Sequence, residues 1–192
     1  MIVVLALGLA LGIQHFIVKP YQIPSGSMEP TLDINQRVLV NRFVYRFTDP
    51  GIGDIVVFHP PEGANGNPRC GDPAAGASGS SDRPCDRPVP QQDNGTNFIK
   101  RIVAGPGDTL SVESGHAVVN GEIAQESFIR PCSAGNACNL PGTITIPPDH
   151  YFMMGDNRGA SDDSRFWGPV PRDWIIGKAF ATYWPPDRFG IF

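Results

Sequence analysis

The chain has 192 residues and a formal net charge of −4. This length suits one domain with an elaborated loop, and the acidic balance argues against a nucleic-acid partner, because no basic stripe is available to neutralise phosphates. The 22 glycines and 20 prolines favour a turn-rich, mainly β protein, and no internal repeat is visible.

The first element is an apolar run over residues 2–18, interrupted only by Gln14 and His15. As a helix it would reach about 26 Å, just enough to cross the hydrocarbon core of a bilayer. We therefore predict an uncleaved membrane anchor over residues 1–19. A buried core helix and a cleaved signal peptide are the alternatives, but no basic residue precedes the run and no small-residue cleavage site follows it. For the same reason the positive-inside rule gives no orientation.

An irregular segment follows the anchor, reading Ile-Pro-Ser-Gly-Ser-Met-Glu-Pro-Thr-Leu over residues 23–32. Prolines fix φ and remove amide donors, so this segment cannot be a helix interior or a central strand. Gly26 allows the close approach that a hydroxyl offered to a substrate carbonyl needs. An ordinary loop is the simpler interpretation, and Ser27 needs partners from elsewhere to become a candidate nucleophile.

The next two predicted strands span residues 36–43 and 54–59, with a turn at 48–51 between them. From Pro60 to Asn97 the chain has almost no large apolar residues and is dense in Pro, Gly, Ser and Asp. Such a segment cannot bury enough area to offset a backbone ordering cost of about 1–2 kcal/mol per residue. We expect residues 60–97 to be a flexible insertion within a domain that spans residues 20–192.

A strand predicted over residues 98–104 carries two adjacent cations on opposite faces. Lys100 shares its face with Phe98 and Ile102, and Arg101 points to the other face. Because both faces are otherwise apolar, we expect one of the two cations to be partly buried.

The remaining pattern is also strand and turn. Strands are expected at residues 109–112, 117–119, 143–146, 151–154 and 174–183. Ser114-Gly115 and Asn120-Gly121 read as tight turns. A polar loop over residues 155–168 concentrates five ionisable side chains and two hydroxyls.

The four cysteines have no zinc-ligand spacing, and the histidines are scattered. Each pair of cysteines lies in a polar loop rich in Pro, Gly or Asn. Two local disulfides, Cys70 with Cys85 and Cys132 with Cys138, are therefore favoured over the other connectivities, with free buried thiols as the alternative. Disulfides would place the domain outside the cytoplasm.

A serine attacks a carbonyl only if a base removes its proton, and no histidine here has a recognisable catalytic context. Lys100 is the leading alternative. Its pKa would have to fall by about 3 units from ~10.4, and desolvation by its apolar neighbours is the plausible means. A strand lysine that extends its amine into solvent is the simpler interpretation.

The loop over residues 155–168 offers Ser161 or Ser164 to orient a neutral lysine amine. A calcium site is the rival, but the acidic residues do not alternate as an EF-hand loop requires. Asp163 and Arg165 more simply form an ion pair that shapes the loop.

Four blocks of sequence, in this order, resemble those of bacterial type I signal peptidase, also called leader peptidase. They read PSGSMEPTL at residues 24–32, GDIVVF at 53–58, IKRIVAGPGD at 99–108 and GDNRGASDDSRFWG at 155–168. The resemblance covers most of the chain apart from the 60–97 insertion and the second cysteine loop. Any one block is weak evidence, but all four in order are specific.

The resemblance implies a membrane-bound serine endopeptidase that removes signal peptides from exported preproteins after small residues, of the Ala-x-Ala type, with no cofactor or metal. Its implied fold is an antiparallel, coiled β-sheet catalytic domain on an N-terminal transmembrane helix. The expected location is the plasma membrane, crossed once, with the catalytic domain on the extracytoplasmic face. Signal peptides and the lipid bilayer are then the expected partners.

Carried over residue by residue, the resemblance makes Ser27 the nucleophile and Lys100 the general base. Ser25 would add its hydroxyl to an oxyanion hole with the Ser27 amide, and Ser161 would hydrogen-bond the Lys100 amine. Asp163 and Arg165 would hold the last loop. Substrate would bind extended, as an added strand, over shallow pockets whose matching residues are Ile23, Pro24, Met28, Leu32, Phe98 and Ile99.

Two other functions stay open on the residues alone. One is a self-cleaving repressor-type Ser/Lys peptidase, although such proteins are soluble and carry a DNA-binding domain. The other is a non-enzymatic, membrane-anchored β-domain that binds an extracytoplasmic partner, with calcium as the bridging ion. Metal dependence separates the last from the leading hypothesis, which predicts full peptidase activity in chelator.

Overall fold

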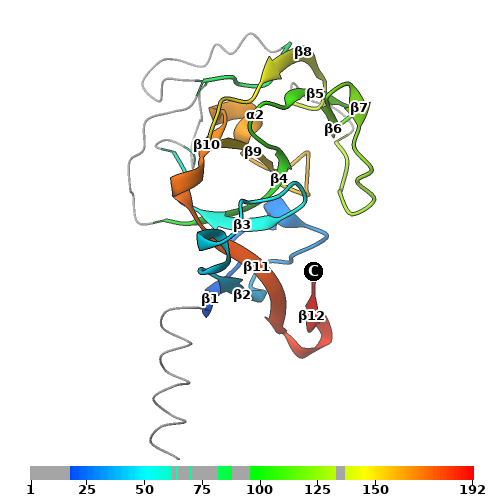
Figure 1. The fold of residues 1–192 in the computed structure, drawn as a ribbon. Coiled ribbons are helices and arrows are strands. Elements are labelled where there is room, and N and C mark those ends of the chain that lie inside the picture. Colours follow the sequence, from blue (N-terminus) through cyan, green and yellow to red (C-terminus); the bar gives the residue numbers. More distant parts are fainter. Residues whose placement is uncertain (1–17, 62–63, 65–69, 71–81, 88–95, 133–136) are drawn as a thin grey trace, which may run out of the picture.

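The computed structural model describes residues 18–61, 64, 70, 82–87, 96–132 and 137–192. In these residues the chain forms two antiparallel sheets with short connecting helices (Figure 1). The predicted mainly β, antiparallel fold is thus confirmed. The predicted anchor lies outside the described residues except for Val18 and Lys19, which begin the first strand. Within the described ranges, no helix is long and apolar enough to cross a bilayer.

The larger sheet has eight strands in the order β1-β2-β11-β3-β4-β9-β10, with β12 paired to β11. Strand β11, near the end of the chain, lies between β2 and β3. The strands are β1 (Val18–Gln22), β2 (Arg37–Asn41), β3 (Ile55–Phe58), β4 (Phe98–Ala104), β9 (His150–Met154), β10 (Val170–Pro171), β11 (Ile175–Trp184) and β12 (Gly190–Ile191).

The smaller sheet has the order β7-β6-β5-β8 and lies at the opposite end of the molecule from β1, β2 and β12 (Figure 1). Its strands are β5 (Thr109–Glu113), β6 (His116–Val119), β7 (Glu122–Ile123) and β8 (Leu140–Thr145). The predicted turns join them. Asn120 and Gly121 both have positive φ, at 54° and 85°, the backbone that an Asn-Gly hairpin turn requires.

Five short helices punctuate the strands: η1 (Gly26–Met28), η2 (Val44–Arg46), α2 (Ser164–Trp167), η3 (Arg172–Trp174) and η4 (Pro186–Arg188). The prediction of strand and turn alone was therefore incomplete. Helix α2 begins because the Asp163 side chain caps it by accepting the Arg165 N–H. A helix of four residues is too short to give a sequence periodicity.

Strand β4 is the centre of the core, because both of its faces are covered. Ile102 joins an apolar cluster around Phe58 and Trp167. Val103 belongs to a second cluster between the two sheets, and Ile99 to a third that contains the segment after β1. Any polar side chain on β4 is therefore carried into the interior.

Strand β8 begins at Leu140, three residues before the predicted start. Pro141 has no amide donor, but β8 is the edge of the smaller sheet, where a missing donor is tolerated. Its Gly142 N–H bonds instead to the Asp82 carbonyl at 2.6 Å.

Parts of the expected 60–97 insertion are described, and they contact the rest of the domain. Ala64 is buried in a core cluster, and the Cys85 N–H donates to the Arg165 carbonyl at 3.2 Å. Most of the other residues of this range lie outside the described residues. Both predicted disulfides, Cys70–Cys85 and Cys132–Cys138, are present.

Candidate active site

Ser27 lies in the short helix η1, between the end of β1 and the start of β2. The proline-bracketed sequence prevents a longer regular element, and the chain enters η1 from Ser25 in an extended conformation. Ser27 is 7% exposed. Its carbonyl accepts the Asn157 N–H at 3.0 Å, and the Asn157 side chain donates to the Gly26 carbonyl at 3.1 Å. The polar loop after β9 therefore holds the backbone of the serine segment.

Lys100 is the interior cation of β4, and it meets Ser27. The Lys100 side chain is covered by its neighbours, and its Nζ donates to Ser27 Oγ at 2.6 Å. The Phe98 ring centre lies 5.4 Å from the same nitrogen. Burial lowers the pKa of Lys100 to about 8, although Asp163 and Asp162 partly oppose the shift. A neutral amine beside a serine hydroxyl is therefore accessible near physiological pH.

The two other serines of the expected site are near the dyad but are not bonded to the lysine. Ser25 is exposed, and its hydroxyl donates to Ser27 Oγ at 3.4 Å. Ser161 is buried, and its Oγ lies close enough to Asp163 to help lower the pKa of that carboxyl. That Oγ forms no hydrogen bond of good geometry with any described residue, Lys100 included. The Ser161 hydroxyl thus lies near Asp163 and makes no direct hydrogen bond to Lys100.

Asp163 and Arg165 form a completely buried ion pair, as the sequence suggested. Arg165 Nε donates to Asp163 Oδ1 at 2.8 Å, and Nη2 donates to Oδ2 at the same distance. Asp163 also accepts the Gly155 N–H at 3.0 Å. Burial opposes ionisation of Asp163, but the guanidinium outweighs it, so the pKa of Asp163 lies below its ordinary value. Through Asp163, the ion pair therefore links Gly155, at the start of the loop, to Arg165 near its end.

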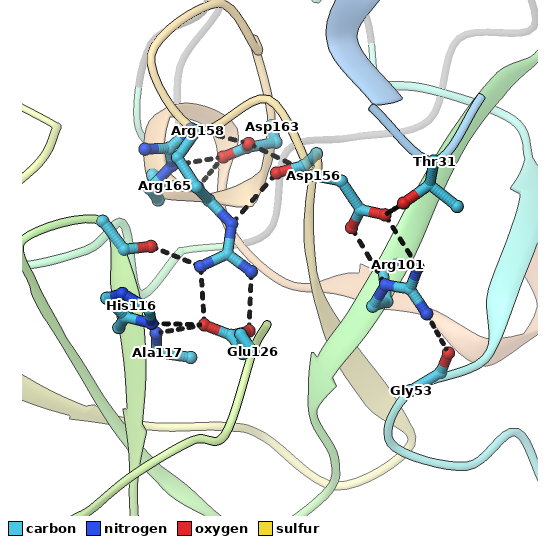
Figure 2. Close-up of polar contacts among 12 residues, drawn as sticks. Thr31, Gly53, Arg101, His116, Ala117, Glu126, Asp156, Arg158, Asp163 and Arg165 are labelled. Atoms are coloured by element: carbon cyan, nitrogen blue, oxygen red, sulfur yellow. Dashed lines mark hydrogen bonds and ion pairs between the residues drawn. The ribbon is translucent and has the colours of Figure 1, made fainter. Parts of the chain in front are cut away.

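A second ionic cluster was missed from the sequence (Figure 2). Asp156 accepts two hydrogen bonds from Arg101, at 2.9 Å from Nε and 2.7 Å from Nη2, and a third from Thr31 Oγ1 at 2.5 Å. Arg101 is adjacent to Lys100, and Thr31 lies four residues after Ser27. The cluster therefore ties together the three segments that form the site. The sequence did carry a signal for this cluster, because Thr31, Arg101 and Asp156 all lie within the four blocks that resemble the family.

The residues expected to line substrate pockets divide into covered and accessible ones. Met28 and Leu32 are fully buried, and Ile23 and Ile99 are 1% and 8% exposed. These four pack in one apolar cluster. Pro24 is exposed and Phe98 is half-buried. In the described part of the chain, no cluster of side chains is suited to hold a metal ion.

The family model described as signal peptidase, peptidase S26, matches residues 1–184. The chain belongs to this family. It is 38% identical over 188 residues to a probable signal peptidase I-2 of Synechocystis sp., covering 98% of this chain and 73% of that protein. It is 37% identical to a signal peptidase I of Leptolyngbya laminosa, over 97% of this chain and 78% of the relative.

A more distant relative agrees. A signal peptidase I of Pseudomonas fluorescens is 34% identical, with 94% of this chain and 70% of that protein covered. A solved signal peptidase I from Enterococcus faecalis V583 overlaps 68% of this chain and 97% of that chain, with a TM-score of 0.45 and 22% identity. The chain is a signal peptidase I, a serine endopeptidase that cleaves signal peptides. The repressor-type peptidase and the non-enzymatic binding domain are thereby set aside.

Proposed function

We propose that this signal peptidase cleaves its substrates with Ser27 as nucleophile and Lys100 as general base. The observation that carries the proposal is the 2.6 Å contact between the buried Lys100 amine and the Ser27 hydroxyl. The neutral amine takes the hydroxyl proton as Ser27 Oγ attacks the scissile carbonyl, and the resulting ammonium gives that proton to the leaving amine. Lys100 then deprotonates the water that hydrolyses the acyl-enzyme, and Ser27 is regenerated.

The groups around the dyad support the other steps. Ser25 is exposed and within 3.4 Å of Ser27 Oγ, so its hydroxyl is available to the oxyanion together with the Ser27 amide. The buried hydroxyl of Ser161, near Asp163, is available to orient the neutral Lys100 amine. Asp163 and Arg165 keep the loop that carries Ser161 in one conformation.

A preference for small residues, as in Ala-x-Ala, follows from the covered apolar residues beside Ser27. Ile23, Met28, Leu32 and Ile99 already fill the interior against one another. A substrate strand laid over this closed cluster would find little depth for its side chains, and the more exposed Pro24 and Phe98 would meet it at the surface. Large side chains have no space there without repacking this cluster.

A site of action at the outer face of a membrane fits three features. The apolar run at residues 2–18 is long enough to be an anchor. Two disulfides suit an oxidising compartment rather than the cytoplasm. The described chain enters the larger sheet at Val18, immediately after that run.

The test is cleavage of a preprotein with Ala-x-Ala before its mature start, by the full chain in detergent. We expect the wild type to cut after the second alanine, with equal activity in chelator. Ser27→Ala and Lys100→Ala should be inactive while remaining folded, and Ser127→Ala, at an exposed serine, should match the wild type. Activity retained by either dyad variant would exclude the assignment.

A further inference from the structure

A buried ion pair outside the dyad links the smaller sheet to the loop that contacts the nucleophile (Figure 2). The Arg158 side chain is completely covered, and the Glu126 side chain is 5% exposed. Arg158 donates from Nη1 to Glu126 Oε2 at 2.8 Å and from Nη2 to Oε1 at 2.6 Å. Nη1 also donates to the Gly115 carbonyl, and Nε to the Gly155 carbonyl at 3.0 Å.

Glu126 is itself fixed by the smaller sheet. Its Oε2 accepts the Ala117 N–H of β6 at 3.1 Å. His116 Nδ1 lies 3.5 Å from the same oxygen but forms no hydrogen bond with any described residue. The carboxylate is therefore the charge partner of a guanidinium that has no access to water, and its removal leaves that charge uncompensated.

The other end of Arg158 holds the backbone that touches Ser27. Gly155, whose carbonyl Arg158 binds, is packed so tightly that a Cβ there would overlap both the Ser27 carbonyl oxygen and Ser161 Oγ. Asn157, one residue before Arg158, donates its N–H to the Ser27 carbonyl. The turn over residues 155–158 thus has the nucleophile on one side and Arg158 on the other.

We propose that Glu126, which lies outside all four sequence blocks, is a positioning residue for peptide cleavage and acts through Arg158. A carboxylate held by the smaller sheet through the Ala117 N–H fixes the guanidinium, the guanidinium fixes the Gly155 carbonyl, and the turn fixes Ser27 relative to Lys100. Reactive groups need placement within about 0.5 Å, and a misplacement of about 1 Å costs about 100-fold in rate. The inference rests on the proposed role of Ser27.

The first test is Glu126→Gln in the full chain in detergent, since glutamine keeps the shape of the side chain and removes its charge. We expect kcat to fall by about 10- to 100-fold with KM changed less than twofold, because substrate does not reach Glu126. Glu113→Gln, at an exposed glutamate of β5, should keep the wild-type kcat. An unchanged kcat, or an effect confined to KM, would overturn the proposal.

The second test separates positioning from stability. Glu126→Leu alone should lower the unfolding midpoint, because it leaves Arg158 unpaired, and adding Arg158→Met should restore the midpoint by removing the second charge. The double variant still lacks the donor to the Gly155 carbonyl, so its kcat should stay at least about tenfold low. A wild-type kcat in the double variant, whatever its stability, would mean that the Glu126–Arg158 ion pair contributes only to stability and does not position Ser27. Ser27→Ala is measured in parallel. If it keeps its activity, the assignment of Ser27 as nucleophile is wrong. If it is inactive while the Glu126 variants keep the wild-type kcat, only this proposal is wrong.

Discussion

Lys100 and Arg101 are adjacent cations with opposite roles, because β4 is covered on both sides. Among the described residues, no carboxylate forms an ion pair with the Lys100 amine, so burial outweighs the nearby acidic groups and lowers its pKa. Arg101 points to the face where Asp156 pairs with it in two hydrogen bonds. One side chain is thus prepared to lose a proton, and the other to keep a permanent charge.

The first prediction concerns the pH dependence of cleavage. The amine must be neutral to act as a base, and the folded-state pKa of Lys100 is about 8. Below pH 8 the amine is charged, so kcat should rise with pH through a midpoint near 8 and then level off. Lys100→Arg should be inactive at every pH, because a guanidinium keeps its proton. Lys178→Arg, which can keep the ion pair with Asp54, is the control and should leave the profile unmoved.

The second prediction concerns Asp156. Its carboxylate is fully buried against Arg101, so Asp156→Asn should cost about 3–5 kcal/mol of unfolding free energy in urea titrations. The ion pair of Arg172 with Asp49 is exposed, and Asp49→Asn should cost less than about 1 kcal/mol. Equal losses in the two variants would mean that the buried cluster does not hold the three segments together.

At the scale of elements, the strands were predictable and the contacts between them were not. Residues 98–104 alternate between two apolar faces, and β4 spans that range. Helix η1 and helix α2 are too short for a periodic signal, so the sequence indicated only irregular segments there. Local loop composition was sufficient to pair the cysteines.

The sequence pointed to Ser27 and Lys100 but not to most of the contacts around them. Ser27 and Lys100 stood out by chemistry and by resemblance, and the structure brings them together. Thr31 and Asp156 are 125 positions apart, and no local pattern announces their hydrogen bond. Glu126 lies in a loop whose sequence looks like any polar turn, because only the folded chain brings it to Arg158.

The third prediction concerns Gly155, the closest contact between the last loop and the serine segment. A Cβ added there would overlap the Ser27 carbonyl oxygen and the Ser161 hydroxyl, so the backbone must shift. We expect Gly155→Ala to abolish most peptidase activity and to cost about 1–3 kcal/mol in chemical denaturation. Gly190→Ala has open space at its Cβ position and should change neither quantity. An active, stable Gly155→Ala would show that the packing around Ser27 is looser than the structure indicates.

For the whole molecule, most large exposed apolar side chains belong to the larger sheet and its loops. They include Ile34, Phe47, Trp184, Phe189 and Ile191, each at least 50% exposed. On the smaller sheet, Ile123 is a large apolar side chain with a similar exposed fraction. Strands β1, β2 and β12 lie together at one end (Figure 1). We propose that this end of the larger sheet, with exposed Trp184 on β11 and exposed Ile191 on β12, rests on a bilayer.

The fourth prediction uses the three tryptophans. Trp167 and Trp174 are 1% and 5% exposed, and Trp184 is 50% exposed. In the full chain reconstituted into vesicles, a quencher attached to lipid acyl chains should therefore reduce the fluorescence of Trp184 alone. Trp184→Phe should abolish the quenchable fraction, and Trp174→Phe should leave it intact. Quenching that survives Trp184→Phe would place a different face against the bilayer.

The position of β11 also sets the order in which the two halves of the larger sheet can be joined. Ser27 precedes β2 and Lys100 lies on β4, and in the sheet these two halves are joined through β11, which follows both of them along the chain. A growing chain that has not yet added residues 175–184 lacks the strand between these halves. We therefore expect Ser27 and Lys100 to come into register only after β11 has been made and has inserted between β2 and β3.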